Sequence, residues 1–357
     1  MASLTIYAGP SALKKLQRDG FRQEHFKVLV GSSGGPKWFV LLGLDRYLFG
    51  EFFSGRTAEL FTVGSSVGAW RMCCLATQDP VGSIERLARY YSHEKYSKQP
   101  TVKEITDSAR IMLHRVLGES GANEIVVNDV FRTHIVADRC KGFGSSKLKY
   151  LQAIHLSASA TFNIFSRRSL SIFFERTLFS NMASDSPWSA LSDISTTSAG
   201  LDESNLVDVM IASGSIPFVL EGVNEIKGAK RGHYWDGGII DYHFDWHFHH
   251  GPELVLYPHF SAQLIPGWFD KSLKWRKVKE EYLDNVVLLA PSKEFVASLP
   301  GEKIPDRKDF QNYPYEKRVE VWQEVIKKSE QLALELRTLV ETGEGLDYIR
   351  PIAIRDR

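Results

Sequence analysis

The stretch that most constrains this chain runs from Leu60 to Trp70, where an apolar, β-prone segment ends in a glycine and helical spacing follows. Gly64, Ser66 and Gly68 form a G-x-S-x-G pattern at this junction. A serine at the tip of a tight strand-to-helix turn needs small residues two places before and after it, because neighbouring chain passes close to both positions. The helix N-terminus also directs N–H groups and the positive end of its dipole at the hydroxyl. The pattern makes Ser66 a candidate nucleophile, with an ordinary Gly/Ser turn as the alternative.

A second glycine-rich junction precedes this one. The apolar segment 26–30 is followed by a turn that contains Gly34, Gly35 and Lys37, and then by leucines at helical spacing. Such a turn directs several backbone N–H groups at one point, which suits an anion. The turn matches neither the P-loop pattern nor G-x-G-x-x-G, so an oxyanion hole fits it better than a nucleotide site. The alternative is a turn that only lets the helix pack closely on the strand.

Two consecutive strand–helix units favour an α/β fold with a parallel sheet and both turns at the same edge. The spacing of apolar residues predicts further helices over residues 11–20, 68–79, 82–117, 206–211 and 315–340. It predicts further strands over 131–137, 150–156, 170–174, 253–256 and 285–290. The Ser- and Thr-rich run 180–200 is expected to form a loop or mobile flap. The helix over 315–340 is amphipathic, and we expect it to pack on its own domain.

Composition limits the classes of function. The 357 residues carry a net charge of +1 and no long basic run, so no long-range field is present to attract nucleic acid. Cys73 and Cys74 are adjacent, which is a poor geometry for a mutual disulfide. The first 20 residues lack the apolar core of a secretory signal, and no apolar run approaches the roughly 20 residues that cross a bilayer. We therefore expect a cytoplasmic protein whose contact with a membrane is at most peripheral.

An aspartate followed by two glycines ends another apolar segment, at Asp236, Gly237 and Gly238. This sequence places a short carboxylate on a turn with open backbone space beside it. Taken alone, D-G-G is a common turn. Its value lies in its combination with the two glycine-rich junctions upstream.

Two other stretches have both a functional and a structural interpretation. Histidines at 243, 247, 249 and 250 lie close to Asp241 and Asp245, but they lack the H-E-x-x-H spacing or any comparable ligand spacing, so packing is favoured over a metal site. In residues 264–279, aromatic residues stand beside several lysines. A lipid–water interface and a partly buried loop with a solvated basic face both fit this pattern, and the loop is the default.

Read in order, four motifs resemble the patatin-like phospholipase family. They are the glycine-rich turn Ser33–Trp38, the G-x-S-x-G at 64–68, the Ala-Ser-x-x-Ile-Pro segment Ala212–Pro217 and the Asp-Gly-Gly turn at 236–238. The resemblance covers residues 28–241 and implies a three-layer α/β fold with a mainly parallel sheet. It implies a Ser–Asp dyad in which Ser66 is the nucleophile and Asp236 the base, with Gly34, Gly35 and Lys37 at the oxyanion hole and no cofactor.

The implied activity is that of a carboxylic ester hydrolase of the phospholipase A or lysophospholipase type, acting on a lipid or related acyl ester. We expect residues 1–310 to form the hydrolase domain and residues 311–357 to add a helix and tail packed on it. Two features depart from the family pattern. Ser33 and Trp38 replace glycines of the oxyanion turn, and Asp241-Tyr242-His243 replaces the Asn-x-Pro that usually follows the aspartate turn. Residues 257–357 show no resemblance.

Two alternatives stay open. The order Ser66, Asp236 and then His243 or His247 also fits a Ser-Asp-His esterase or thioesterase. A catalytically inert lipid- or protein-binding module that keeps a hydrolase fold is the other, although the presence of both Ser66 and Asp236 favours an enzyme. The sequence carries no indication of the oligomeric state.

Overall fold

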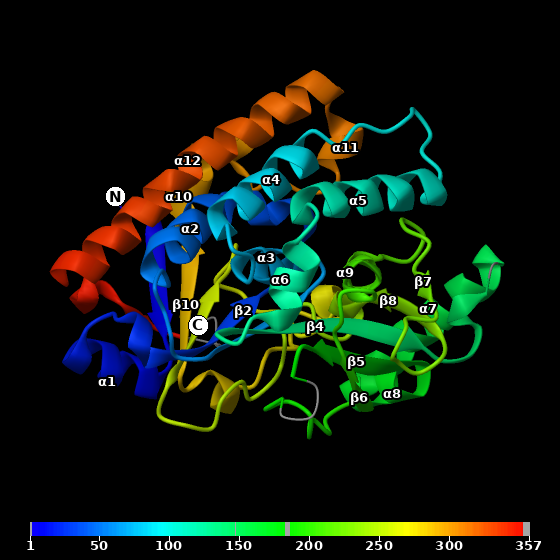
Figure 1. The fold of residues 1–357 in the computed structure, drawn as a ribbon, viewed down its shortest axis with the longest axis horizontal. Coiled ribbons are helices and arrows are strands. Elements are labelled where there is room, and N and C mark those ends of the chain that lie inside the picture. Colours follow the sequence, from blue (N-terminus) through cyan, green and yellow to red (C-terminus); the bar gives the residue numbers. More distant parts are fainter. Residues whose placement is uncertain (1, 147, 183–185, 353–357) are drawn as a thin grey trace.

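The computed structural model describes residues 2–146, 148–182 and 186–352 and has an α/β architecture around one mainly parallel sheet (Figure 1). The strand order is β11-β1-β10-β9-β2-β3-β4-β5-β6, with β8 also paired to β4, and β7 to β8. The strands are β1 (Leu4–Ala8), β2 (Phe26–Gly31), β3 (Leu60–Ser65), β4 (Phe131–Cys140), β5 (Phe174–Ser180), β6 (Thr196–Gly200), β7 (Val223–Asn224), β8 (His233–Asp236), β9 (Leu254–Pro258), β10 (Val286–Pro291) and β11 (Arg350–Pro351). The pairings from β10 through β9, β2 and β3 to β4 are all parallel. The predicted fold class is therefore confirmed.

The helices lie between and beside these strands. They are α1 (Pro10–Asp19), α2 (Leu42–Tyr47), α3 (Val67–Leu75), α4 (Pro80–Ser92), α5 (Val102–Leu117), α6 (Gly121–Val127), α7 (Lys149–Phe165), α8 (Leu170–Phe173), α9 (Leu206–Gly214), α10 (Lys293–Ser298), α11 (Asp309–Asn312) and α12 (Tyr315–Thr342). Short helical turns include η2 (Gly35–Leu41), η4 (Gly142–Ser145), η6 (Gly237–Ile239), η7 (Trp268–Ser272) and η8 (Glu280–Leu283). The helical pattern predicted over 82–117 is divided between α4 and α5.

Alternate residues of the central strands enter two hydrophobic clusters, one on each face of the sheet. On β2, Leu29 belongs to the cluster shared with α2, α3, α4, α9 and α12, whereas Val28 and Val30 belong to the cluster on the opposite face. That second cluster is closed by Trp246 and its aromatic neighbours and by Leu283 of η8. Figure 1 shows α2, α4, α5 and α12 together on one side of the sheet. Both faces of the sheet are therefore covered, and its strand ends are left to form a site.

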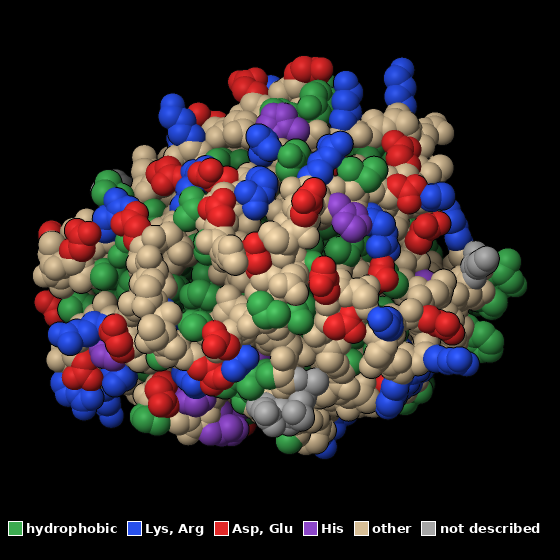
Figure 2. All heavy atoms as spheres, in the orientation of Figure 1, with side chains coloured by type: hydrophobic (Ala, Val, Ile, Leu, Met, Phe, Trp, Pro, Cys, Tyr) green, Lys and Arg blue, Asp and Glu red, His purple; other side chains and the backbone are tan. Residues whose placement is uncertain are grey.

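Helix α12 runs across the outside of this helical layer (Figure 1). It contacts α2, η2 and β1, and the Ser329 hydroxyl accepts a hydrogen bond of 2.9 Å from the N–H of Gly43. Trp322 of α12 is fully buried, and its ring packs on Phe39. The amphipathic helix expected near the C-terminus thus packs on the residues that precede it. Over the surface seen in Figure 2, side chains of both charge signs are intermixed.

Two predicted strands are wrong. Residues 150–156 lie within α7, and residues 170–173 form α8, so that Phe174 is the first residue of β5. Most large apolar residues of α7 lie on its exposed side, with Leu156 buried, so their pattern does not mark a buried strand face. Strand β5 escaped prediction because it carries Glu175 and Arg176, whose charges are buried and paired.

The expected loop over 180–200 is only partly correct. Ser180 ends β5, and Thr196–Gly200 forms β6, which pairs in parallel with β5. Between them, Trp188 is buried and donates a hydrogen bond of 2.9 Å from its indole to the carbonyl of Phe248. Residues 183–185 lie outside the described part. Ser/Thr-rich segments form strands poorly on their own, so β6 depends on its pairing with β5.

Candidate active site

Ser66 lies directly after the last residue of β3 and immediately before α3. Its backbone has φ 55° and ψ −136°, a conformation that costs a non-glycine residue about 1–3 kcal/mol. A Cβ on Gly64 would lie 2.4 Å from the nitrogen of Ala69, and one on Gly68 would lie 2.0 Å from the carbonyl oxygen of Gly31. The two glycines therefore let the start of α3 pass close to β2 and β3. A strained serine at the tip of such a turn presents its hydroxyl above the strand ends.

Strand β4 brings Asp236 to the same place. Ser65, the last residue of β3, pairs with Val136, and Asp236, the last residue of β8, pairs with the next residue, Ala137. Strand β5 pairs with one edge of β4 over residues 134–140. Strands β3 and β8 therefore share the other edge, and β8 begins to pair where β3 stops. Because β3 runs parallel to β4 and β8 runs antiparallel to it, the two C-terminal ends meet. The register of one strand thus places both predicted catalytic residues side by side.

The side chains of Ser66 and Asp236 are directly hydrogen-bonded. The Ser66 hydroxyl donates to Oδ2 of Asp236 at 2.9 Å, and the N–H of Gly238 donates to Oδ1 at 2.7 Å. The backbone N–H of Asp236 donates to the carbonyl of Ser215 at 2.9 Å. Both dyad residues are only 6% exposed. The carboxylate is therefore held in one orientation with an oxygen pointed at the serine.

The glycines after Asp236 leave room that a larger residue would fill. A Cβ on Gly237 would lie 2.2 Å from the carbonyl oxygen of Val136, and one on Gly238 would lie 2.6 Å from the Ser33 hydroxyl. The second of these distances also shows that the glycine-rich turn lies against the aspartate turn. The two motifs, about 200 residues apart in the sequence, therefore lie next to each other.

The carboxyl group of Asp236 has an altered acidity. Burial raises the pKa of Asp236 to about 6, against the opposing effects of the Gly238 N–H, the Ser66 hydroxyl and the nearby positive charges of Arg307 and Lys271. A buried carboxylate loses hydration that favours its charged form, which is the dominant effect here. Asp236 is consequently a stronger base than an ordinary aspartate and is still ionised at neutral pH.

Two serines connect the glycine-rich turn to the strand-to-helix turn at Ser66, which we call the elbow. Ser33 donates to the hydroxyl of Ser65 at 2.7 Å, and Ser65 donates onward to the carbonyl of Asp241 at 2.6 Å. Gly35 has φ 55°, and within the part of the chain that the structure describes the N–H groups of Gly34 and Gly35 have no acceptor. No protein acceptor therefore occupies either N–H group in the described residues.

Lys37 contacts an aromatic ring. Its ammonium group is 5.0 Å from the centre of the Phe260 ring, and burial lowers the pKa of Lys37. Among the described residues no hydrogen bond or ion pair joins it to Ser66 or Asp236. The structure brings together Ser66, Asp236 and the glycines of the two turns, whereas Lys37 lies over the Phe260 ring.

Ser213 supports the strained elbow, and sequence reasoning gave it no role. Its hydroxyl accepts a hydrogen bond of 2.9 Å from the N–H of Ser66 and donates one of 2.6 Å to the carbonyl of Val136. The Ser213 hydroxyl thus provides an acceptor for the buried N–H of Ser66, which the backbone conformation of Ser66 takes out of the hydrogen bonding of the sheet. The signal was present in the Ala-Ser-x-x-Ile-Pro segment, whose serine is this residue.

Three further side chains border the site and belong to none of the sequence motifs. A Cβ on Gly35 would lie 3.5 Å from the Tyr91 hydroxyl and 3.5 Å from Cγ of Arg307. The ammonium group of Lys271 lies 3.7 Å from the centre of the Tyr242 ring. Tyr91 belongs to the apolar pattern of α4, and Arg307 and Lys271 come from the region without family resemblance. Tertiary structure alone assembles them here.

The loop after the aspartate turn is fixed by buried charges. Arg176 is fully buried and binds both carboxylate oxygens of Asp241, at 2.6 and 3.0 Å, and also both oxygens of Asp193. Asp138 is equally buried and accepts a hydrogen bond of 2.9 Å from the N–H of Ile240. Burial raises the pKa of Asp138 well above its ordinary value. Asp241 therefore has a structural partner that holds the chain beside Asp236.

The histidines near the site make contacts of their own. The Nδ1 atom of His243 accepts a hydrogen bond of 2.9 Å from the N–H of Ile265, and its ring stacks on Tyr242. His247 stacks on His250, and His249 pairs with Glu253. In the described ranges no histidine is hydrogen-bonded to either dyad residue, and no group of His, Cys, Asp or Glu is arranged to hold a metal ion. The geometry thus offers a dyad and gives no support to a triad.

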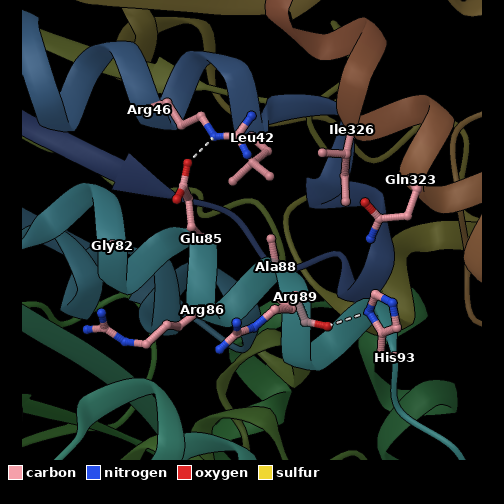
Figure 3. Close-up of a pocket in the computed structure, with 10 residues that line it drawn as sticks. All are labelled: Leu42, Arg46, Gly82, Glu85, Arg86, Ala88, Arg89, His93, Gln323 and Ile326. Carbon is pink, nitrogen blue, oxygen red and sulfur yellow. Dashed lines mark hydrogen bonds and ion pairs between the residues drawn. The ribbon is translucent and has the colours of Figure 1, made fainter.

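A separate groove of about 590 Å³ lies between α2, α4 and α12 (Figure 3). It is lined by Leu42, Arg46, Gly82, Glu85, Arg86, Ala88, Arg89, His93, Gln323 and Ile326. Its charged groups are largely occupied, since Arg46 pairs with Glu85 and Glu330 and Arg86 donates to the carbonyl of Val116. The groove contains none of the predicted site residues and no hydroxyl or thiol side chain. We therefore place the chemistry at the dyad rather than in the groove.

Comparisons with known proteins add no family. No protein-family model matches the chain, and a search of curated proteins gave no match. The resemblance to patatin-like phospholipases accordingly stays an expectation based on four motifs. Across the described helices, none combines the length and the apolar character that crossing a membrane requires.

Proposed function

We propose that this chain is a serine acyl hydrolase that releases fatty acid from a phospholipid, lysophospholipid or related lipid ester. The observation that carries the proposal is the 2.9 Å hydrogen bond from the Ser66 hydroxyl to a buried carboxylate oxygen of Asp236, at a backbone-strained elbow before a helix. A nucleophile within hydrogen-bond reach of an oriented base is the arrangement that covalent acyl transfer requires. The lipid part of the proposal comes from the motif resemblance. A cytoplasmic location is proposed with it.

In the first half-reaction, Asp236 accepts the proton of the Ser66 hydroxyl as its oxygen attacks the acyl carbonyl. The carbonyl oxygen becomes an oxyanion, which the free N–H groups of Gly34 and Gly35 and the N-terminus of α3 stabilise. Collapse of the tetrahedral intermediate breaks the ester bond, and the proton on Asp236 passes to the leaving alcohol. The product is an acyl-enzyme on Ser66 and a free alcohol.

In the second half-reaction, water replaces the alcohol. Asp236 accepts a proton from this water, whose oxygen attacks the acyl carbonyl, and a second oxyanion forms in the same place. Collapse returns the proton from Asp236 to Ser66 and releases the fatty acid. The raised pKa of Asp236, about 6, suits this exchange, because a base works best when its pKa lies near the working pH. No metal or cofactor enters either step of the proposal.

The test is release of fatty acid from a panel of phosphatidylcholine, lysophosphatidylcholine, an acylglycerol and a short p-nitrophenyl ester. Wild type is compared with Ser66→Ala, Asp236→Asn and, as a matched serine control, the exposed Ser204→Ala. We expect turnover by wild type and Ser204→Ala and losses of at least about 1000-fold in the two dyad variants. Turnover of the short ester alone would remove the lipid assignment and leave the dyad.

A fluorophosphonate probe separates an enzyme from an inert binding module. We expect the probe to label wild type at Ser66, as read by peptide mass spectrometry, and to leave Ser66→Ala unlabelled. His243→Asn tests the triad alternative, because it removes the imidazole base. A loss as deep as that of Ser66→Ala would favour a triad, whereas retained turnover supports the dyad. Absence of both labelling and turnover would overturn the proposal.

A further inference from the structure

Helix α7 exposes an apolar stripe. Tyr150, Ile154, Phe162 and Phe165 are 62%, 61%, 51% and 84% exposed. Their spacing of four, eight and three residues places them on one side of the helix. Figure 2 shows hydrophobic side chains at the right-hand edge of the molecule, where Figure 1 labels α7. A contiguous group of exposed apolar side chains often marks a binding surface, whereas single exposed apolar residues are common and need no explanation.

The opposite side of α7, which faces the protein, is mostly polar. Its buried residues are Gln152, His155, Ser159 and Asn163, with Leu156 as the apolar exception. Asn163 donates a hydrogen bond of 2.7 Å to the buried carboxylate of Asp270, and Ser159 donates to the carbonyl of His155. A surface helix normally buries its apolar side, so α7 has the reverse arrangement. The core of this chain therefore does not account for the apolar stripe.

Two neighbouring elements extend the stripe. Ile172 in α8 is 62% exposed, and α8 contacts α7. Trp275, which follows η7, is 66% exposed, and the next residue, Arg276, donates hydrogen bonds to the carbonyls of Asn163 and Ile164. We call the exposed apolar set the α7 surface; it consists of Tyr150, Ile154, Phe162, Phe165, Ile172 and Trp275. It combines α7 with the Trp- and Lys-rich segment 264–279 that the sequence singled out.

Basic residues predominate around the α7 surface, although one of them, Arg167, is paired with Asp241, Asp245 and Asp270. Residues 141–174 contain five Lys or Arg and no Asp or Glu, and residues 271–279 contain five more Lys or Arg and again no acid. Of these, Lys149 on α7 and Arg168 just after it are exposed. The rest of the chain must be acidic in compensation, because the whole carries a net charge of only +1. A local positive charge next to apolar and aromatic side chains is complementary to an anionic lipid headgroup layer.

We propose that the α7 surface is a docking site for anionic lipid bilayers. The aromatic and aliphatic side chains would enter the boundary between headgroups and acyl chains, and Lys149 and Arg168 would face the lipid phosphates. A second copy of this chain is the less favourable occupant, because joining two α7 surfaces would bring like charges together.

Helix α7 and the turn after it are connected to the segment that follows Asp236. Arg167, two residues after the end of α7, donates a hydrogen bond of 2.6 Å to the carbonyl of Ile240, which lies four residues after Asp236. Asn163 binds Asp270 of η7, and the carboxylate of Asp270 also accepts from the N–H of Gly267 at 2.9 Å. Docking would therefore bring the bilayer to an element that contacts the chain just after the aspartate turn. Supply of lipid to the dyad rests on the proposed function; the docking itself does not.

The docking test uses Ser66→Ala protein, so that no lipid is consumed. Binding is measured by co-sedimentation with vesicles of phosphatidylcholine alone and of phosphatidylcholine with about 30% phosphatidylserine. The docking variant is Ile154→Ser with Phe165→Ser. The matched control is Leu334→Ser with Tyr348→Ser, which alters residues of 60% and 84% exposure on α12 and just beyond it. All four positions are exposed, and circular dichroism verifies that both double variants are folded.

We expect binding to the phosphatidylserine vesicles, weakening by at least about tenfold in the docking variant, and no change in the control. Binding should also weaken as salt is raised, because lipid and protein charges are then screened. Equal binding by both double variants, or binding to neither vesicle, would overturn the proposal. The proposal would also be overturned if the protein self-associates without binding vesicles and the docking variant abolishes that self-association.

A second readout separates docking from catalysis. In protein with Ser66 intact, the docking variant should hydrolyse the short p-nitrophenyl ester at the wild-type rate and lose hydrolysis of vesicle lipid by about the same factor as binding. Failure of the proposed function would appear as vesicle binding without turnover of any ester. Failure of the docking proposal would appear as turnover of the short ester and of vesicle lipid that is equal in both double variants.

Discussion

The hydroxyl of Ser66 lies 2.9 Å from Oδ2 of Asp236 although 170 residues separate them in the chain. The contact follows from the pairing of consecutive residues of β4, Val136 with the end of β3 and Ala137 with the end of β8. Ser213 strengthens the same junction, since its hydroxyl connects the N–H of Ser66 to the carbonyl of Val136. The strand register therefore places Ser66 and Asp236 next to each other through their backbones.

The activity should rise with pH through the pKa of Asp236. Only the ionised carboxylate can accept the serine proton, and burial raises that pKa to about 6. We expect kcat/KM for the p-nitrophenyl ester to be constant near pH 8 and to fall about tenfold per pH unit well below pH 6. The measurement is a pH profile at constant ionic strength. A profile that is flat down to pH 4.5 would show that Asp236 is not the base.

Removing Arg307 should shift this profile to higher pH. Its positive charge is among the influences that lower the pKa of Asp236, so Arg307→Ala leaves the carboxyl easier to protonate. The side chain is exposed, and its effect is therefore screened by salt. We expect the midpoint to move upward at low ionic strength and the difference to shrink at high salt. The control is Arg337→Ala, an arginine on α12 that pairs with Glu51, and it should leave the midpoint in place.

Replacing Asp236 by asparagine should stabilise the folded protein at alkaline pH. A carboxyl whose folded pKa is about 6 and whose ordinary pKa is 3.8 binds protons more tightly in the folded state, so stability falls as pH rises from about 4 to 6. At about 1.4 kcal/mol per pKa unit, the deficit above pH 6 is about 3 kcal/mol. Urea unfolding of Asp236→Asn should show a gain of up to that amount at pH 8 and none near pH 4. An equal or lower stability at pH 8 would contradict the burial argument.

The parts of the fold that the sequence predicted are those with strong local patterns. Strands β2, β3, β9 and β10 are largely apolar runs, β4 contains the apolar segment 135–137, and the helices between them have clear periodicity. Strand β5 was missed because its buried Arg176 is neutralised by Asp241 and Asp193, partners that lie 65 and 17 residues away. Local composition cannot reveal a charge pair that only tertiary structure forms.

Helix α7 was mistaken for a strand for a different reason. Prediction assumes that apolar residues face the protein, whereas here Ile154 and Phe165 are exposed and Gln152 and Asn163 are buried. At the site, motifs located Ser66, Asp236 and their glycines, because these residue types are required by local backbone geometry. Tyr91 and Arg307 reach the site only through packing, so no spacing in the sequence identifies them.

The steric requirement at the elbow gives the last prediction. A methyl group on Gly68 would lie 2.0 Å from the oxygen and 2.3 Å from the carbon of the Gly31 carbonyl, and both atoms belong to the backbone of β2. No rotamer change can relieve this overlap, so α3 must move away from the sheet and carry Ser66 with it. We expect Gly68→Ala to lose about 3 kcal/mol of stability and most of its esterase activity. Gly200→Ala is the control, because nothing lies within 4 Å of its Cβ position, and its stability should change by no more than about 0.5 kcal/mol. Urea unfolding and ester hydrolysis of the two variants measure the difference. Wild-type stability and turnover in Gly68→Ala would mean that the close passage of α3 over β2 is not what holds Ser66 in place.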